Sequence, residues 1–268
     1  MPLASIICAV PGPIMRDKHY FDLILYKTYA DMRAETARTY IGYLWWLIDP
    51  LVAMATYYVV FGLFLQTKTE DFIPFLLIGV AVWQWFATTV SKGANTVRAA
   101  ASLISQVYIP KLVFPTVAIL LAFLHFVVVL LLLIAFCTFY GLSFSPSYTA
   151  LLVIVAVQFL FSGSLAYLLA ALIPFIPDLR NFVDYGLRML MFLSGVFYPA
   201  AQLPERVQTW FYLNPMANLI ESYRDVLIHQ RWPDFGALGL VALLSCAIVV
   251  PAIYLLTRYD RVYPKVVD

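Results

Sequence analysis

Long apolar runs separated by short polar segments dominate the pattern of this chain. A helix needs roughly 20 mainly apolar residues to cross about 30 Å of hydrocarbon, and several stretches approach or exceed that length. They lie at about 42–66, 72–91, 112–140, 148–173, 180–198 and 236–257. The pattern therefore predicts an all-α integral membrane protein with six transmembrane helices, built as one domain over residues 1–268.

The segment before the first run has a different pattern, because charged residues are interleaved with aromatic ones. Within residues 16–38, one helical face is largely apolar and aromatic: Phe21, Ile24, Leu25, Thr28, Tyr29 and Met32. Most charges lie off that face, so the segment predicts an amphipathic helix lying in the membrane interface. An ordinary cytoplasmic helix packed on the bundle is the alternative, and it would also lie at the inner membrane surface.

Two segments between the runs are neither apolar enough to span nor polar enough to be disordered. Residues 93–106 are rich in small residues and predict a helical segment. Residues 203–231 predict two short helices, since Pro204 interrupts helical structure and Asn214-Pro215 supplies the cap and first turn of a new helix. We expect these two helices to dip into the outer leaflet and return, which requires surrounding protein or a water-filled cavity. An ordinary external loop with capped helices is the alternative.

The distribution of basic residues predicts the orientation. Thirteen of the 17 Lys and Arg residues fall on one side of the predicted spans, and four fall on the other. Basic flanks resist translocation, so the richer side is predicted to be cytoplasmic. Both termini and residues 93–106 then lie in the cytoplasm, whereas residues 203–231 lie outside.

Composition agrees with the membrane class and excludes several others. Hydrophobic residues make up 63% of the chain and charged residues only 12%, whereas soluble domains carry about 25% charged residues. The net charge of +2 does not indicate nucleic acid as a partner. Cys8, Cys137 and Cys246 are isolated and match no metal or disulfide pattern. Residues 1–15 lack the basic start of a secretory signal peptide.

Nothing in the chain predicts catalysis. The sequence contains no Gly-Lys dipeptide and hence no phosphate-binding P-loop. We therefore expect the chain not to be an enzyme by itself, and an ATP-driven process would require a separate ATPase chain. Asp178 and Asp184 form too weak an acidic pair for an intramembrane glycosyltransferase. A secondary transporter would need ion-coupling residues and repeated halves, and neither is evident.

Several short motifs follow one another in a distinctive order. They are Arg38, Tyr40, Gly42, Trp45 and Pro50; Leu103 to Pro115; Asp178 with Arg180; Leu193 to Pro199; Leu203-Pro204; Asn214-Pro215; and Glu221 with Arg224. Their joint order, over about residues 33–228, resembles the membrane (permease) subunit of ABC-2 type polysaccharide exporters. This family includes exporters of O-antigen, capsule and teichoic acid.

Each motif also has a plain structural interpretation. Pro110 and Pro115 suit the beginning of the third span, because proline fits a first helical turn. Asp178 suits a helix cap, and Glu221 and Arg224 are spaced to pair on one helical face.

The resemblance implies an assembly and a cargo. Two copies of the chain would associate with two ABC ATPase subunits, which bind ATP and Mg, and the chain itself would need no cofactor. The channel would lie between the two copies, in the bacterial inner membrane. The implied cargo is undecaprenyl-diphosphate-linked O-antigen polysaccharide, a step in lipopolysaccharide biosynthesis. Capsular polysaccharide, teichoic acid and, less readily, a drug or small lipid are the alternatives.

The resemblance also assigns roles to individual residues. The lipid-linked substrate would be admitted near Arg33, Arg38, Tyr40, Trp45 and Trp46. Residues 93–106 would form the coupling helix that docks on the ATPase, through Asn95, Arg98, Ser102 and Leu103. A periplasmic gate would include Asn214, Glu221 and Arg224.

Aromatic residues make up 16% of the chain and suggest how a glycan would pass. Most Trp and Tyr residues at span ends are expected to form interface belts. Those within spans must face something other than lipid, and aromatic rings can stack weakly on sugars. The predicted channel-lining residues are Tyr57, Tyr58, Phe192, Phe197 and Tyr198. Two ionisable residues within spans, Asp49 and His125, are expected to face the bundle interior.

Overall fold

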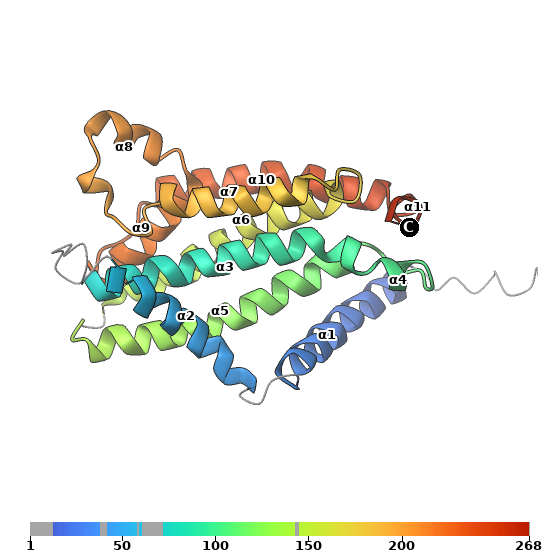
Figure 1. The fold of residues 1–268 in the computed structure, drawn as a ribbon, viewed down its shortest axis with the longest axis horizontal. Helices are drawn as coiled ribbons and strands as arrows, with labels where there is room; N and C mark the ends of the chain where they lie inside the picture. Colours follow the sequence, from blue (N-terminus) through green and yellow to red (C-terminus); the bar gives the residue numbers. More distant parts are fainter. Residues whose placement is uncertain (1–12, 38–41, 58, 61–71, 143–144, 268) are drawn as a thin grey trace, which may run out of the picture.

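The computed structural model describes residues 13–37, 42–57, 59–60, 72–142 and 145–267 of the 268-residue chain. Every regular element in these residues is a helix, and the longest ones lie side by side as a bundle (Figure 1). Its long helices are α3 (Phe72–Ala99), α5 (Val113–Phe139), α6 (Leu151–Leu172) and α10 (Phe235–Arg258). The short helix η4 (Pro146–Ala150) leads directly into α6. These four long helices are long and apolar enough to cross a membrane, so the chain is an integral membrane protein.

The other two predicted spans correspond to shorter helices. In the described residues, α2 (Trp45–Tyr57) has 13 residues and α7 (Leu179–Leu193) has 15, below the length of a full span. The six-span count is therefore not confirmed. Helix α7 ends early because Gly195 adopts a φ of +69°, and a Cβ there would meet the Phe211 ring at 2.6 Å.

Helix α6 packs against both α3 and α10, and small residues allow close approach. A Cβ added at Gly93 would lie 2.6 Å from the Cβ of Ala166, so the backbones of α3 and α6 pass each other closely there. The fully buried Gln158 of α6 donates a hydrogen bond to the Val82 carbonyl of α3 at 3.0 Å. Close packing and this polar link fix α6 against α3.

Stacked aromatic rings join α3 to its neighbours. Trp85 stacks on Phe126 of α5 with ring centroids 4.0 Å apart, and Phe86 stacks on Phe161 of α6 at 5.7 Å. All four rings are buried. Ring pairs of this kind stabilise beyond the area they bury, by about 1 kcal/mol each. Helix α3 is therefore the best anchored of the long helices.

Several other helices lie at the two ends of the bundle and on its flank (Figure 1). Helix α4 (Ala101–Ile104) and α11 (Tyr263–Val267) lie at one end, whereas α8 (Glu205–Phe211) and α9 (Pro215–Leu227) lie at the other. Helix α1 (Pro13–Ala37) packs obliquely against α5, outside the bundle of long helices. Two short 3-10 helices, η2 (Gly42–Leu44) and η5 (Ala200–Gln202), precede α2 and α8.

The structure refines the predicted boundaries of three segments outside the long apolar runs. Residues 16–38 correspond to α1, and residues 203–231 do contain two short helices. Residues 93–106 do not form one separate helix, because α3 continues to Ala99 and only α4 stands apart. Gly93 and Val97 are buried against the bundle, so packing rather than local polarity decides where α3 ends.

Candidate functional site

Helix α3 carries a polar stripe along one face. Gln84, Thr88, Ser91, Lys92 and Asn95 recur at the three- and four-residue spacing of a helical face, and all are exposed or half-buried. The rest of the helix is mostly buried and apolar. Hydropathy averaged along the run hides this stripe, but its helical spacing is visible in the sequence.

A second polar face lies on α7 and meets the first. Asn181, Asp184, Tyr185 and Arg188 share one side of α7, which has no fully buried residue. The Ser91 hydroxyl of α3 donates a hydrogen bond to Asp184 Oδ1 at 3.3 Å. We call the joint surface of these α3 and α7 residues the polar face.

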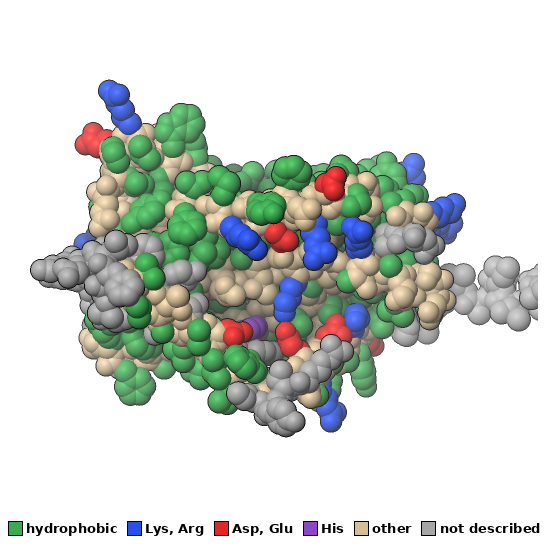
Figure 2. Space-filling model, in the orientation of Figure 1, with side chains coloured by type: hydrophobic (Ala, Val, Ile, Leu, Met, Phe, Trp, Pro, Cys, Tyr) green, Lys and Arg blue, Asp and Glu red, His purple; other side chains and the backbone are tan. Residues whose placement is uncertain are grey.

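Figure 2 shows where charged side chains lie on this side of the molecule. Lys, Arg, Asp and Glu side chains gather along the middle of the view, over the region of α3 and α7, around a tan strip of other side chains and backbone. Hydrophobic side chains cover much of the surface above and below. Charged and polar groups at membrane depth normally face a bundle interior or water rather than lipid.

A small cavity opens beside the polar face, between α2, α3 and α5. Its volume is about 50 Å³, and its polar lining comprises Asp49, Gln84, Thr88 and His125. Asp49 and His125, the two ionisable residues predicted within spans, therefore lie around one cavity. The volume suffices for ordered water, which would extend the hydrogen-bonding surface of the polar face.

The buried side chain of Arg224 ties α9 to the ends of α7 and α3. Its guanidinium donates to the carbonyls of Gly195 at 2.8 Å, Val196 at 2.9 Å and Phe75 at 3.3 Å. It also lies 3.4 Å from the centroid of the Phe75 ring. A Cβ added at Gly79 would meet Arg224 Nη2 at 2.6 Å, so glycine makes room for the guanidinium.

Asn214 makes a second link between α9 and α7. Its Oδ1 accepts a hydrogen bond from the Met216 backbone N–H at 3.0 Å, which confirms the predicted cap of α9. Its Nδ2 donates to Ser194 Oγ at 2.9 Å. Two of the three predicted gate residues therefore converge on the end of α7, and we call this group the α7–α9 junction.

The pairing predicted between Glu221 and Arg224 is wrong. Arg224 points its donors at backbone carbonyls, and the Glu221 carboxylate instead accepts a hydrogen bond from the Tyr212 hydroxyl at 3.3 Å. Burial raises the pKa of Tyr212, and the nearby Glu221 carboxylate adds to the shift. The capping interpretation of Asp178 also fails, because its side chain makes no capping hydrogen bond to α7.

A large cavity lies between α9 and the first turns of α10. It measures about 710 Å³, and three carboxylates line it, those of Glu221, Asp225 and Asp234. Asp234 caps α10 by accepting from Gly236 N at 2.8 Å and Ala237 N at 3.2 Å. Burial raises the pKa of Asp225, and Glu221 adds to the shift. This end of the molecule therefore offers hydrogen-bond acceptors to hydroxyl groups.

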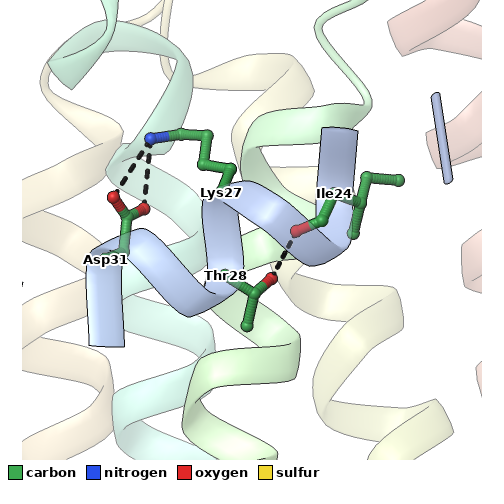
Figure 3. A network of polar contacts seen from close by, with 4 residues as sticks. All are labelled: Ile24, Lys27, Thr28 and Asp31. Carbon is green, nitrogen blue, oxygen red and sulfur yellow. Dashed lines mark hydrogen bonds and ion pairs between the residues drawn. The ribbon is translucent and has the colours of Figure 1, made fainter. Parts of the chain in front are cut away.

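Another cavity, of about 380 Å³, separates α1 from α3, α4 and α5. Lys27 and Lys92 lie on its polar side, whereas Phe114 and Val117 belong to its apolar lining. Lys27 Nζ donates to Asp31 Oδ1 at 3.3 Å and Oδ2 at 3.1 Å, as Figure 3 shows. Lys92 Nζ donates to Glu35 Oε1 at 3.1 Å. A cavity lined by ammonium groups on one side and apolar side chains on the other suits a lipid that carries a phosphate group.

The predicted coupling residues do not share one element. Asn95 belongs to the polar stripe of α3, where its Nδ2 donates to the Ser91 carbonyl at 2.8 Å. Arg98 lies exposed in the last turn of α3, and Ser102 and Leu103 lie exposed on α4. With Val107 just beyond α4, Leu103 presents an apolar surface at the end of the bundle.

The predicted substrate-admission residues are only partly described. Arg33 is exposed on α1, and Trp45 is 40% exposed at the start of α2. Arg38 and Tyr40 lie outside the described residues, as does the side chain of Trp46.

The predicted channel-lining residues divide in the same way. Phe192 is exposed on α7, but Phe197 is buried with 4% exposure. Tyr198 is half-buried and donates its hydroxyl to the Phe192 carbonyl at 2.8 Å. Tyr58 and the side chain of Tyr57 lie outside the described part of the chain.

Comparisons with known proteins identify a family and several relatives. A family model described as ABC-2 type transporter matches residues 27–228. The chain is 28% identical over 235 residues to the O-antigen export system permease protein RfbA of Myxococcus xanthus, covering 86% of this chain and 89% of that protein. It is 27% identical over 212 residues to RfbA of Klebsiella pneumoniae, covering 79% and 82%. It is 19% identical over 218 residues to the polysialic acid transport protein KpsM of Escherichia coli, covering 80% and 84%.

Proposed function

Because the chain belongs to the ABC-2 type transporter family, whose permeases work with an ATPase partner, we propose that it exports a lipid-linked polysaccharide. The cargo proposed is undecaprenyl-diphosphate-linked O-antigen, moved across the bacterial inner membrane from the cytoplasm to the periplasm. Relatives named O-antigen export permeases support this choice of cargo.

The polar face is the observation that carries the proposal. A polysaccharide presents many hydroxyl groups, and each must exchange hydrogen bonds with water for bonds to a protein or to water in the channel. Hydroxyls, amides and charges on α3 and α7, such as Thr88, Gln84 and Asp184, would supply such partners within the membrane. Two copies facing each other through the polar face would enclose this surface away from lipid.

We propose that the lipid-linked substrate is admitted at the cavity of about 380 Å³ that separates α1 from α3, α4 and α5. Lys27 and Lys92 would exchange their carboxylate partners for the diphosphate, since exposed ion pairs of this kind contribute little and exchange readily. The apolar residues beneath them would receive the first part of the isoprenoid chain. The exposed Arg33 of α1 and the neighbouring Arg38 would add positive charge nearby.

Two ATPase subunits would dock at the end that carries α4. Leu103 and Val107 are exposed there, with 39% and 55% of their surfaces accessible. ATP binding and hydrolysis in those subunits would move α4 and, through it, α3 and α5. Only Ala100 separates α4 from α3, so movement of the docked surface would reach the polar stripe of α3 directly.

Deletion of the gene tests the cargo. Surface and intracellular polysaccharides would be compared by gel electrophoresis and cell fractionation. We expect loss of surface O-antigen, with lipid-linked polymer retained inside the cell. Unchanged surface glycans, in a strain without a second exporter, would contradict the proposal.

A capsular polysaccharide is the second candidate cargo. The similarity to a polysialic acid transport protein favours it, although at lower identity than the O-antigen permeases. Loss of capsule rather than O-antigen in the same deletion would identify this cargo.

A further inference from the structure

The C-terminal segment after α10 lies against the segment that joins α4 to α5. Asp260 accepts two hydrogen bonds from that segment, one from the Tyr108 hydroxyl to Oδ2 at 2.7 Å and one from the Lys111 backbone N–H to Oδ1 at 2.8 Å. The two partners lie about 150 residues away along the sequence, so chain connectivity alone does not bring them together.

The Lys111 side chain reinforces the same connection. It is 1% exposed, and its Nζ donates to the Ile109 carbonyl at 3.1 Å and lies 5.0 Å from the centroid of the Tyr108 ring. A buried ammonium held in this way fixes the path of the chain between α4 and α5. Asp260 therefore contacts an ordered part of that segment.

The far side of the C-terminal segment is anchored in the bundle. Tyr263 is fully buried and donates its hydroxyl to the Ala171 carbonyl at the end of α6, at 3.2 Å. Its ring lies 5.3 Å from that of Phe175. Tyr263 also belongs to a buried cluster with Ile104 of α4 and Leu256 of α10. The segment thus touches the docking end on one side and the central helices on the other.

We propose that residues 259–267 act as a brace that couples the docking surface to α6 and α10, with Asp260 as its positioning residue. This inference rests on the proposed function, because it assumes that an ATPase docks at α4. Without the brace, the exposed Leu103 and Val107 would still bind the ATPase. Movement of the ATPase would then displace α4 without displacing α6 and α10. ATP hydrolysis would continue, but less polymer would be exported for each ATP.

An Asp260→Ala variant tests the proposal in the complete complex, co-expressed with its ATPase and reconstituted in proteoliposomes with lipid-linked polymer. Export per ATP hydrolysed is the readout, because loss of fold would lower both rates together. We expect the ratio to fall about fivefold, which is the lower end of typical coupling between distant sites. Tyr108→Phe removes one of the two hydrogen bonds and should lower the ratio less.

Ser145→Ala is the control. The Ser145 side chain also accepts a backbone hydrogen bond, from Ser147 N at 3.4 Å, but it caps η4, which leads into the end of α6 opposite Ala171. This variant should lower thermal stability and leave export per ATP unchanged.

The possible outcomes separate the brace from the proposed function. An Asp260→Ala complex that exports with the wild-type ratio would overturn the brace alone. An equal fall of the ratio in Asp260→Ala and Ser145→Ala would also overturn it, since location would not matter. A wild-type chain that co-purifies with no ATPase and exports nothing would overturn the proposed function, and the brace with it.

Discussion

Helices α9 and α1 both pack outside the four long helices, yet they are held in different ways. Helix α9 is mostly buried, and Arg224 and Asn214 bond it to the ends of α7 and α3. Helix α1 is nearly twice as long, and its ion pairs, Lys92–Glu35 to α3 and Lys27–Asp31 within the helix, are partly open to solvent. Sequence length and amphipathic pattern therefore do not decide how firmly an element is attached.

The difference indicates what each helix can do. Displacing α9 would leave the buried carbonyls of Gly195 and Val196 without the donor that Arg224 supplies. Displacing α1 would break the Lys92–Glu35 pair, whose partly exposed charges water can solvate. We therefore regard the α7–α9 junction as a fixed unit and expect α1 to move more easily than α9, which suits its proposed role in admitting substrate.

The largest effect is expected from Arg224→Ala. The substitution removes the donor of two buried carbonyls, those of Gly195 and Val196, and leaves a cavity, so we expect the free energy of unfolding to fall by about 3 kcal/mol. Thermal unfolding of the detergent-purified protein would measure it. Arg188→Ala, at an exposed arginine on α7, is the control. Equal melting temperatures for the two variants would contradict the fixed junction.

Gly79→Ala tests the same junction without removing a donor. The added Cβ would lie 2.6 Å from Arg224 Nη2 and 2.9 Å from the Val196 carbonyl oxygen, so we expect a loss of roughly 1–3 kcal/mol. Gly239→Ala on α10 is the matched control, because nothing lies within 4 Å of its Cβ position. That control should be neutral or stabilising, by up to about 1 kcal/mol. If both substitutions proved neutral, the close packing around Arg224 would be refuted.

Asn214→Ala should have a smaller effect. It removes the cap of α9 and the bond to Ser194, and cap removal typically lowers stability by about 1 kcal/mol. Chemical or thermal unfolding would be compared with that of Asn181→Ala, which alters an exposed asparagine on α7. A gain in stability from Asn214→Ala would show that the cap is not formed.

The smallest effect on stability is expected at α1. Lys92→Gln breaks an ion pair whose side chains are 52% and 43% exposed, so stability should change by less than about 1 kcal/mol. A double-mutant cycle with Glu35→Gln would measure the coupling between the two residues. A coupling as large as the Arg224→Ala effect would remove the contrast between α1 and α9.

The sequence was sufficient for the elements that depend on local pattern. Length and apolarity located the four long helices, and the Asn214-Pro215 step located the start of α9. The predicted span at 180–198 was too long, because Gly195 turns the chain through a left-handed conformation that hydropathy does not register. The polar stripe was readable in the spacing of Gln84, Thr88 and Ser91, but an averaged apolar run conceals it.

Contacts between segments far apart in the chain could not be predicted from the sequence. Arg224 was expected to pair with its helical neighbour Glu221, whereas its partners come from Gly195, Val196 and Phe75. Local spacing identifies which side chains can meet within a helix. It does not show which backbone carbonyls are buried without a backbone donor and therefore need a side chain such as that of Arg224. The hydrogen bonds that Asp260 accepts from Tyr108 and Lys111 likewise join segments far apart in the sequence.

Cysteine accessibility tests the central claim, that the polar face of α3 and α7 lines a water-filled path. Gln84→Cys and Leu243→Cys would be compared after replacement of Cys8, Cys137 and Cys246; Leu243 is 69% exposed on the apolar α10. A thiol reacts with a water-soluble maleimide only where water reaches it, because the thiolate is the nucleophile. We predict labelling at residue 84 and little at residue 243 in membranes. Equal labelling at both positions, or none at residue 84, would contradict the account.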